Sequence, residues 1–168
     1  KKNNRRMMRK FLGIFMAAIL CCGCEWHKDV YFDTPFAYIF DNAGGSTATI
    51  DSKFGKGVEN VLTELKVSIS VSETHFSEPV TVEYEVMAGD GLKEGVDYKI
   101  QPSTASPLTF TPGTYTLPVR IMWLKTDSPD SSKDNTLTIK LSGSSVKDME
   151  LGYPGPSHKG QTFVFTKI

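Results

Sequence analysis

Alternation of apolar and polar residues with a period of two is the feature that most constrains this fold. The run "LKVSISV" at 65–71 places its aliphatic side chains on one face and Lys66, Ser68 and Ser70 on the other. The pattern recurs in "VTVEYEV" at 80–86, "LPVRIMW" at 117–123, "LTIKL" at 137–141 and "TFVFTK" at 162–167. Such alternation is typical of half-buried antiparallel strands. Pro118 lies inside one of these runs and predicts an edge position or a bulge there.

Shorter apolar segments add further strands, and turn residues separate them. We expect short strands near Val30–Phe32, Phe36–Phe40 and Ala48–Ile50. Residues 41–49, "DNAGGSTAT", favour a hairpin turn. The segment 54–65, "FGKGVENVLTEL", comes nearest to a helical period, but its two glycines indicate a loop. With no helix expected, about 7–9 strands in 168 residues predict an all-β protein with a single antiparallel β-sandwich.

The first 23 residues have the pattern of a targeting segment. "KKNNRRMMRK" at 1–10 is basic, and "FLGIFMAAIL" at 11–20 is apolar. An apolar run of this length is too short for a transmembrane helix, which needs about 20 residues. It suits the hydrophobic region of a secretory signal. We therefore predict a signal peptide at 1–23.

All cysteines of the chain lie in "LCCGC" at 20–24. This stretch resembles the lipobox of bacterial lipoproteins, in which a small residue, often Gly, precedes the Cys that becomes diacylated. Cys24 follows Gly23 and fits best, whereas Cys22 is a poorer fit. The resemblance implies a diacylglycerol on Cys24 that anchors the chain to the outer membrane. A diacylated Cys supplies the apolar area that stable anchoring requires.

On this interpretation, a tether at 24–34 precedes a β-sandwich at 35–168. Glu25 and Asp29 partly match the acidic export signal that sends Bacteroidetes lipoproteins to the cell surface, so the cell surface is expected rather than the periplasmic face. A disulfide and a zinc site are the alternatives for the cysteines. Adjacent cysteines rarely bridge, and no further Cys is present to complete a zinc site.

Charge is balanced overall but unevenly distributed. Of 19 Lys and Arg residues, six lie within residues 1–10, which leaves 13 against 19 acidic residues in the remainder, a net charge of −6. Binding to nucleic-acid phosphates requires clustered Lys and Arg. No such cluster follows Lys10. We therefore expect no nucleic-acid partner.

The segment 78–152 resembles a Calx-beta domain or a related immunoglobulin-like sandwich. The family pattern combines a "G-x-D-Y" turn, an "L-T-F-x-P-G" unit and an acidic loop between strands. The matching positions are Gly95, Asp97, Tyr98, Leu108, Phe110, Pro112, Gly113 and Leu141. The resemblance implies an immunoglobulin-like arrangement of the strands.

Calx-beta domains of the calcium-sensing kind bind Ca²⁺ through carboxylates at one end of the sandwich. The resemblance therefore implies a Ca²⁺ site formed by Asp97 with Asp127, Asp130 and Asp134. Ca²⁺ takes six to eight oxygen ligands. Ser, Pro and Lys residues dilute the acidic loop in this sequence, and the alternative is that Asp97 caps its own turn while the other aspartates solubilise a loop.

Together with the lipobox, the chain resembles small Bacteroidetes outer-membrane lipoproteins of unknown function. Such proteins are often encoded beside SusC/SusD-type uptake systems. The resemblance implies a non-catalytic accessory subunit of a glycan or peptide uptake system. The alternative is a Ca²⁺-dependent adhesion or structural module at the cell surface.

No residue pattern indicates catalysis. His27, His75 and His158 are far apart in the sequence, and the chain has no G-x-S-x-G, H-E-x-x-H or Gly-rich phosphate loop. We therefore expect no enzyme, no catalytic residues and no organic cofactor.

Aromatic residues are the remaining candidates for ligand contacts, because Trp and Tyr faces form apolar platforms. Trp123 alternates in phase with Ile121, which predicts a core position. Tyr153 lies in the loop "LGYPGPSHKG", and Phe36 and Tyr38 lie near the start of the domain. Phe36 and Tyr38 either pack on the sandwich or meet a partner, and the sequence assigns no ligand-binding residue among these aromatics.

Overall fold

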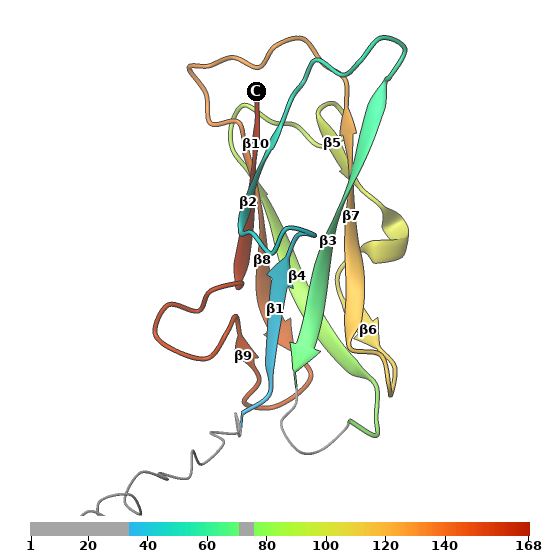
Figure 1. Cartoon of the computed structure of the whole chain (residues 1–168), viewed down its shortest axis with the longest axis vertical. Helices are drawn as coiled ribbons and strands as arrows, with labels where there is room; N and C mark the ends of the chain where they lie inside the picture. Colours follow the sequence, from blue (N-terminus) through green and yellow to red (C-terminus); the bar gives the residue numbers. More distant parts are fainter. Residues whose placement is uncertain (1–33, 71–75) are drawn as a thin grey trace, which may run out of the picture. The chain divides into compact units, whose positions relative to one another are not determined.

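The computed structural model describes residues 34–70 and 76–168, whose regular secondary structure is almost entirely β-strand (Figure 1). The elements are β1 (Phe36–Phe40), β2 (Thr47–Ile50), β3 (Asn60–Ser70), β4 (Val80–Ala88), β5 (Tyr98–Ile100), the 3₁₀ turn η1 (Pro102–Thr104), β6 (Leu108–Phe110), β7 (Thr116–Leu124), β8 (Thr136–Ser144), β9 (Glu150–Leu151) and β10 (Thr162–Lys167). Within these two ranges, no helix is long and apolar enough to cross a membrane.

Several predictions concern residues outside the described ranges. They are the signal peptide at 1–23, lipidation of Cys24 and almost all of the tether at 24–34. The short strand expected near Val30–Phe32, as well as His27 and His75, also lies outside them.

The strands form two five-stranded sheets, which confirms the predicted all-β sandwich. One sheet has the order β5-β7-β3-β1-β9, and the other has the order β2-β10-β8-β4-β6. Most neighbours are antiparallel, as expected, but β1 pairs with β9 and β10 with β2 in parallel. The described residues contain ten strands rather than 7–9, because β5, β6 and β9 are short segments of two or three residues.

The core lies between the inner faces of the two sheets. Leu65 and Val67 of β3 and Ile121 of β7 are almost fully buried, in phase with the predicted alternation. Trp123 has no exposed surface, which confirms its predicted core position, and its Nε1–H donates to Thr63 Oγ1 at 2.9 Å. Burying a side chain of this size contributes about 4–6 kcal/mol before conformational entropy is subtracted.

The predicted hairpin turn at 41–49 is wrong, because β1 and β2 belong to different sheets. The segment between them crosses from one sheet to the other instead of pairing its flanks. Asp41 stabilises this crossing, since its Oδ1 accepts the N–H groups of Ala43 at 3.0 Å and Gly45 at 2.7 Å. Gly44 supplies a left-handed conformation, with a φ of +75°.

The predicted loop at 54–65 is also only partly correct. Strand β3 begins at Asn60, because Asn60–Glu64 pair with Arg120–Leu124 of β7. Pro118 of β7 pairs with Lys66 on one side, whereas on the other side β5 reaches only Ile121–Trp123. Pro118 therefore lies at a local sheet edge, as predicted for a residue without a backbone N–H.

A buried lysine ties the last strand to the loops at one end of the sandwich. Lys167 continues the inward phase of Phe163 and Phe165, and its side chain has no exposed surface. Its Nζ lies 3.0 Å from Asp97 Oδ1 and 2.8 Å from Thr126 Oγ1, and it also donates to the carbonyls of Asp97 and Leu124. A buried ammonium is tolerated when it is paired and hydrogen-bonded in this way.

Candidate functional site

Strand β1 presents aromatic side chains on the outer face of its sheet. Ala37 and Ile39 point into the core and are almost fully buried. Successive side chains of a strand point to opposite faces, so Phe36, Tyr38 and Phe40 lie on the outer face. Phe36 is nevertheless buried, whereas Tyr38 and Phe40 are partly exposed.

Tyr153, from the loop between β9 and β10, joins these rings. Its ring centroid lies 4.5 Å from that of Tyr38 and 5.7 Å from that of Phe36. Tyr38 in turn stacks on Phe40, with 5.2 Å between centroids and an interplanar angle of 21°. We call Phe36, Tyr38, Phe40 and Tyr153 the aromatic surface. Burial raises the pKa of the Tyr153 hydroxyl, and its interaction with Tyr38 raises it further.

Backbone hydrogen bonds fix the β9–β10 loop against the edge of β1. Gly152 N–H donates to Ala37 O at 2.7 Å, and Ile39 N–H donates to Gly160 O at 2.7 Å. These two bonds lie at the two ends of the loop. They hold Tyr153 beside Tyr38 and occupy the edge of β1 that would otherwise be free.

The loop is also tightly closed on itself. Tyr153 N–H donates to Lys159 O at 2.6 Å. Gly152 has a φ of +93°, and a side chain there would collide with the carbonyl oxygen of His158. His158 itself has a φ of +40°, which is uncommon for a residue other than Gly. The local sequence therefore builds a compact loop that presents Tyr153 and Lys159 together.

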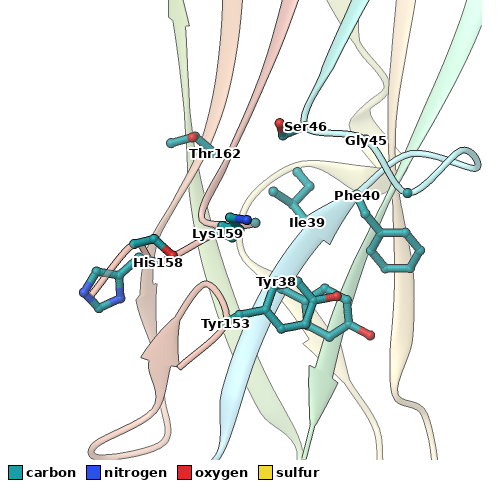
Figure 2. A pocket seen from close by; sticks show the side chains of 12 residues that line it. Tyr38, Ile39, Phe40, Gly45, Ser46, Tyr153, His158, Lys159 and Thr162 are labelled. Carbon is teal, nitrogen blue, oxygen red and sulfur yellow. The ribbon is translucent and has the colours of Figure 1, made fainter. Parts of the chain in front are cut away.

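A depression of about 530 Å³ lies beside the aromatic surface (Figure 2). Tyr38, Phe40 and Tyr153 form its aromatic part. Its polar side chains are Ser46, Ser157, His158, Lys159 and Thr162. In Figure 2, Lys159 lies between the tyrosine pair and the residues Ser46 and Thr162, whereas the His158 ring points away from the tyrosines. None of the described residues that line it is Asp, Glu or Cys.

A second, smaller depression of about 360 Å³ lies beside β6, β7 and η1. Arg120 is the charged residue that lines it, and its Nε donates to Glu64 Oε2 at 2.9 Å. No aromatic ring is among its described lining residues. It therefore lacks the aromatic rings of the first depression, and its charged residue is already ion-paired.

Asp97, the first predicted Ca²⁺ ligand, has its carboxylate engaged on both oxygens. Oδ1 pairs with Lys167 Nζ at 3.0 Å, and Oδ2 accepts the N–H of Lys93 at 2.9 Å. The second bond caps the turn in which Asp97 lies. The Lys167 ammonium already supplies a positive charge at this carboxylate.

The other predicted Ca²⁺ ligands make local bonds within their own loop. Asp130 Oδ1 accepts the N–H and hydroxyl of Ser132, and these bonds lower the pKa of Asp130. Asp134 Oδ1 accepts the N–H and hydroxyl of Thr136. Among the described residues, the Asp127 side chain makes no hydrogen bond or ion pair. Across residues 34–70 and 76–168, no three His, Cys, Asp or Glu side chains gather in a way that could hold a metal ion.

Comparison with family models and with curated proteins finds no match. No family match confirms the Calx-beta resemblance, which stays a prediction. Three similar solved structures come from Bacteroides species, and the two of unknown function have a β-rich fold.

Two of these are proteins of unknown function. A two-domain protein from Bacteroides fragilis is 12% identical, with a TM-score of 0.47 over 80% of this chain and 45% of its own. A protein from Bacteroides ovatus is 13% identical, with a TM-score of 0.45 over 79% and 46%. The third is EndoBT-3987 from Bacteroides thetaiotamicron with Man5GlcNAc product, 10% identical, with a TM-score of 0.47 over 77% and 31%. This chain spans less than half the length of each.

Proposed function

We propose that this chain is a non-catalytic glycan-binding module whose ligand lies on the aromatic surface. The observation that carries the proposal is the Tyr38–Tyr153 pair, which lies beside the depression of about 530 Å³ with its serine and threonine hydroxyls. Sugar rings have apolar C–H faces that pack on aromatic rings, and hydroxyls that bond to polar groups. Ligand sites combine these two kinds of lining, at volumes of about 300–1,000 Å³.

The edge of β1 favours a glycan over an extended peptide at this place. A peptide that adds a strand needs free backbone N–H and C=O groups at a sheet edge. Here Gly152 and Gly160 already bond to Ala37 and Ile39. The groups that stay accessible are side-chain hydroxyls and aromatic faces, which suit a sugar.

The lining of the depression supports binding without cleavage. Glycoside hydrolysis typically uses a pair of Asp or Glu side chains, one as an acid and one as a base or nucleophile. The described lining residues contribute neither Asp nor Glu. The described lining residues therefore provide no carboxylate for glycoside hydrolysis.

The lipid anchor on Cys24 belongs to the proposal, as does a place at the cell surface. Tyr38 follows Cys24 by 14 residues. A fully extended chain spans at most about 3.6 Å per residue, so the aromatic surface would lie within roughly 50 Å of the lipid. We infer that an outer-membrane uptake complex of the SusC/SusD type receives the glycan there.

A binding panel tests the glycan function. The full chain, purified in mild detergent, is run through gels that contain single polysaccharides, and retarded migration reports binding. Tyr38→Ala and Tyr153→Ala are each expected to weaken binding at least tenfold. Leu62→Ala is the matched control, because Leu62 is an exposed apolar residue, 54% accessible, on the same sheet face. Equal binding by all four proteins would place the glycan elsewhere.

Co-purification tests the membrane partner separately. The chain, tagged at its C-terminus, is isolated from membranes in detergent, and intact mass shows whether Cys24 carries lipid. We expect a lipidated chain together with an outer-membrane transporter and its lid lipoprotein. Recovery of the lipidated chain alone would contradict the proposed association with an uptake complex. The glycan site would then depend only on the result of the binding panel.

A further inference from the structure

The charge around the aromatic surface differs from that of the chain as a whole. Beyond the basic N-terminal segment, acidic residues outnumber basic ones, 19 to 13. The described lining of the depression has Lys159 and His158 and no acidic side chain. A lysine in a depression whose described lining has no acidic side chain can attract a ligand of negative charge.

Lys159 is available to such a ligand. The ion pairs among the described residues engage Arg120, Lys125 and Lys167, and Lys159 takes part in none of them. The acidic residue of the adjoining crossing segment is Asp41, whose Oδ1 accepts the Ala43 and Gly45 N–H groups. Among the described residues, the Lys159 ammonium therefore makes no ion pair.

The backbone of Lys159 is held in register with the tyrosine pair. Its carbonyl accepts the Tyr153 N–H at 2.6 Å, and the next residue, Gly160, packs against Tyr38. Figure 2 shows Lys159 between the tyrosine pair and the residues Ser46 and Thr162, with the His158 ring pointing away from the tyrosines. Lys159 is therefore the lining cation that a ligand on the aromatic surface would meet.

We propose that the glycan is acidic, and that Lys159 binds its carboxylate or sulfate group while the sugar ring packs on Tyr38 and Tyr153. This inference rests on the proposed glycan function and deepens it. Uronic acids and sulfated sugars share the anionic group that an ammonium recognises as a point charge. Because Lys159 is exposed, the attraction is screened as salt concentration rises.

Matched polysaccharides test the acidic ligand. The full chain is titrated by calorimetry with polygalacturonate and with its methyl ester, which has the same backbone without charge. Chondroitin sulfate and its desulfated form separate sulfate from carboxylate. We expect about tenfold tighter binding of the charged member of one pair at 50 mM salt, and a smaller difference at 500 mM.

Lys159→Gln is expected to remove most of this preference, because it weakens binding of the charged member much more than binding of the neutral member. Lys147→Gln is the control, because Lys147 is an exposed lysine in the β8–β9 turn, away from the lining residues. Equal affinity for charged and neutral members, with Tyr38→Ala weakening both, would overturn the acidic ligand and keep the glycan function. Binding of no polysaccharide at all would overturn both.

Discussion

Lys159 and Lys167 lie eight residues apart and have opposite surroundings. Lys167 has no exposed surface, and its ammonium meets a carboxylate, a hydroxyl and two carbonyls. Lys159 is exposed, joins no ion pair among the described residues, and borders aromatic rings. Lys167 therefore stabilises the fold, whereas Lys159 is the cation that we propose binds a ligand.

The contrast gives a physical criterion for assigning function on this chain. A charged group that is buried and fully hydrogen-bonded stabilises the fold, and its removal leaves its partners unpaired. A charged group that is exposed without a partner adds little to stability. Burial separates two polar aromatic residues in a similar way: Tyr84 is buried in the core, whereas nearly half of the surface of Tyr153 is accessible.

The largest effect is expected when Lys167 is replaced. Lys167→Met leaves Asp97 without its cation in a largely buried site, which costs about 3–5 kcal/mol in the free energy of unfolding. Urea unfolding followed by Trp123 fluorescence measures it. A second replacement, Asp97→Asn, should recover part of this loss, because it removes the unpaired charge. A loss below about 1 kcal/mol in Lys167→Met would contradict the structural role of the pair.

The buried tyrosine gives a pH-dependent effect. The Tyr84 hydroxyl donates to Thr104 O at 2.6 Å, and burial raises the pKa of Tyr84 to about 12. Between pH 10 and 12, the unfolded chain therefore releases this proton while the native chain keeps it. The stabilisation is complete below pH 10 and is lost as pH rises toward 12, by about 2–3 kcal/mol.

Tyr84→Phe has no hydroxyl to titrate, so its free energy of unfolding should fall less steeply above pH 10 than that of the unmodified chain. Urea titrations at pH 9, 10, 11 and 11.5 measure the two slopes. Parallel slopes would show that Tyr84 does not keep its proton in the native state.

Replacing each of two glycines by Ala distinguishes the effect of displacing the β9–β10 loop from the effect of backbone strain alone. Gly152 and Gly113 both have positive φ values, +93° and +85°. A side chain at Gly113 meets nothing within 4 Å, whereas one at Gly152 collides with His158. Backbone strain should cost about 1–2 kcal/mol of stability in each change to Ala, and the collision with His158 adds to this cost in Gly152→Ala. Only Gly152→Ala should also weaken glycan binding, because it displaces the loop that carries Tyr153. Equal glycan binding by both variants would contradict the role of the closed loop in positioning Tyr153.

The smallest effect is expected at the exposed lysine. Lys159→Gln should change the free energy of unfolding by no more than about 0.5 kcal/mol, because its ammonium has no partner to lose. The measurement is the same urea titration as for Lys167→Met. A loss of 2 kcal/mol or more would show that Lys159 serves the fold after all.

The sandwich could be predicted from the sequence because its inner strands alternate cleanly. Leu137, Ile139 and Leu141 of β8 face the core as expected, with polar residues between them. The start of β3 was not predictable by the same rule. Its first residues, Asn60–Glu64, have mixed burial and follow two glycines, and their pairing with β7 fixes them as a strand.

The candidate site could not be predicted from the sequence, although the sequence shows the aromatic residues of β1. In "FAYIF" both alternating sets are apolar, so the period of two does not say which set faces the core. The structure buries Ala37 and Ile39 in the core and leaves Tyr38 and Phe40 partly exposed, whereas Phe36 is buried although it belongs to the aromatic set. The contact of Tyr38 with Tyr153 depends on how a distant loop docks on β1, which local patterns do not encode.

The most direct test of the account is to map the ligand on the folded chain. Backbone amide NMR shifts are recorded as an acidic oligosaccharide, one that binds in the panel, is titrated into the full chain. We predict that the largest shifts cluster at Gly44–Ser46 and Tyr153–Thr162, on both sides of the aromatic surface. Shifts that cluster instead beside Arg120, at the second depression, would contradict the claim that the aromatic surface is the binding site.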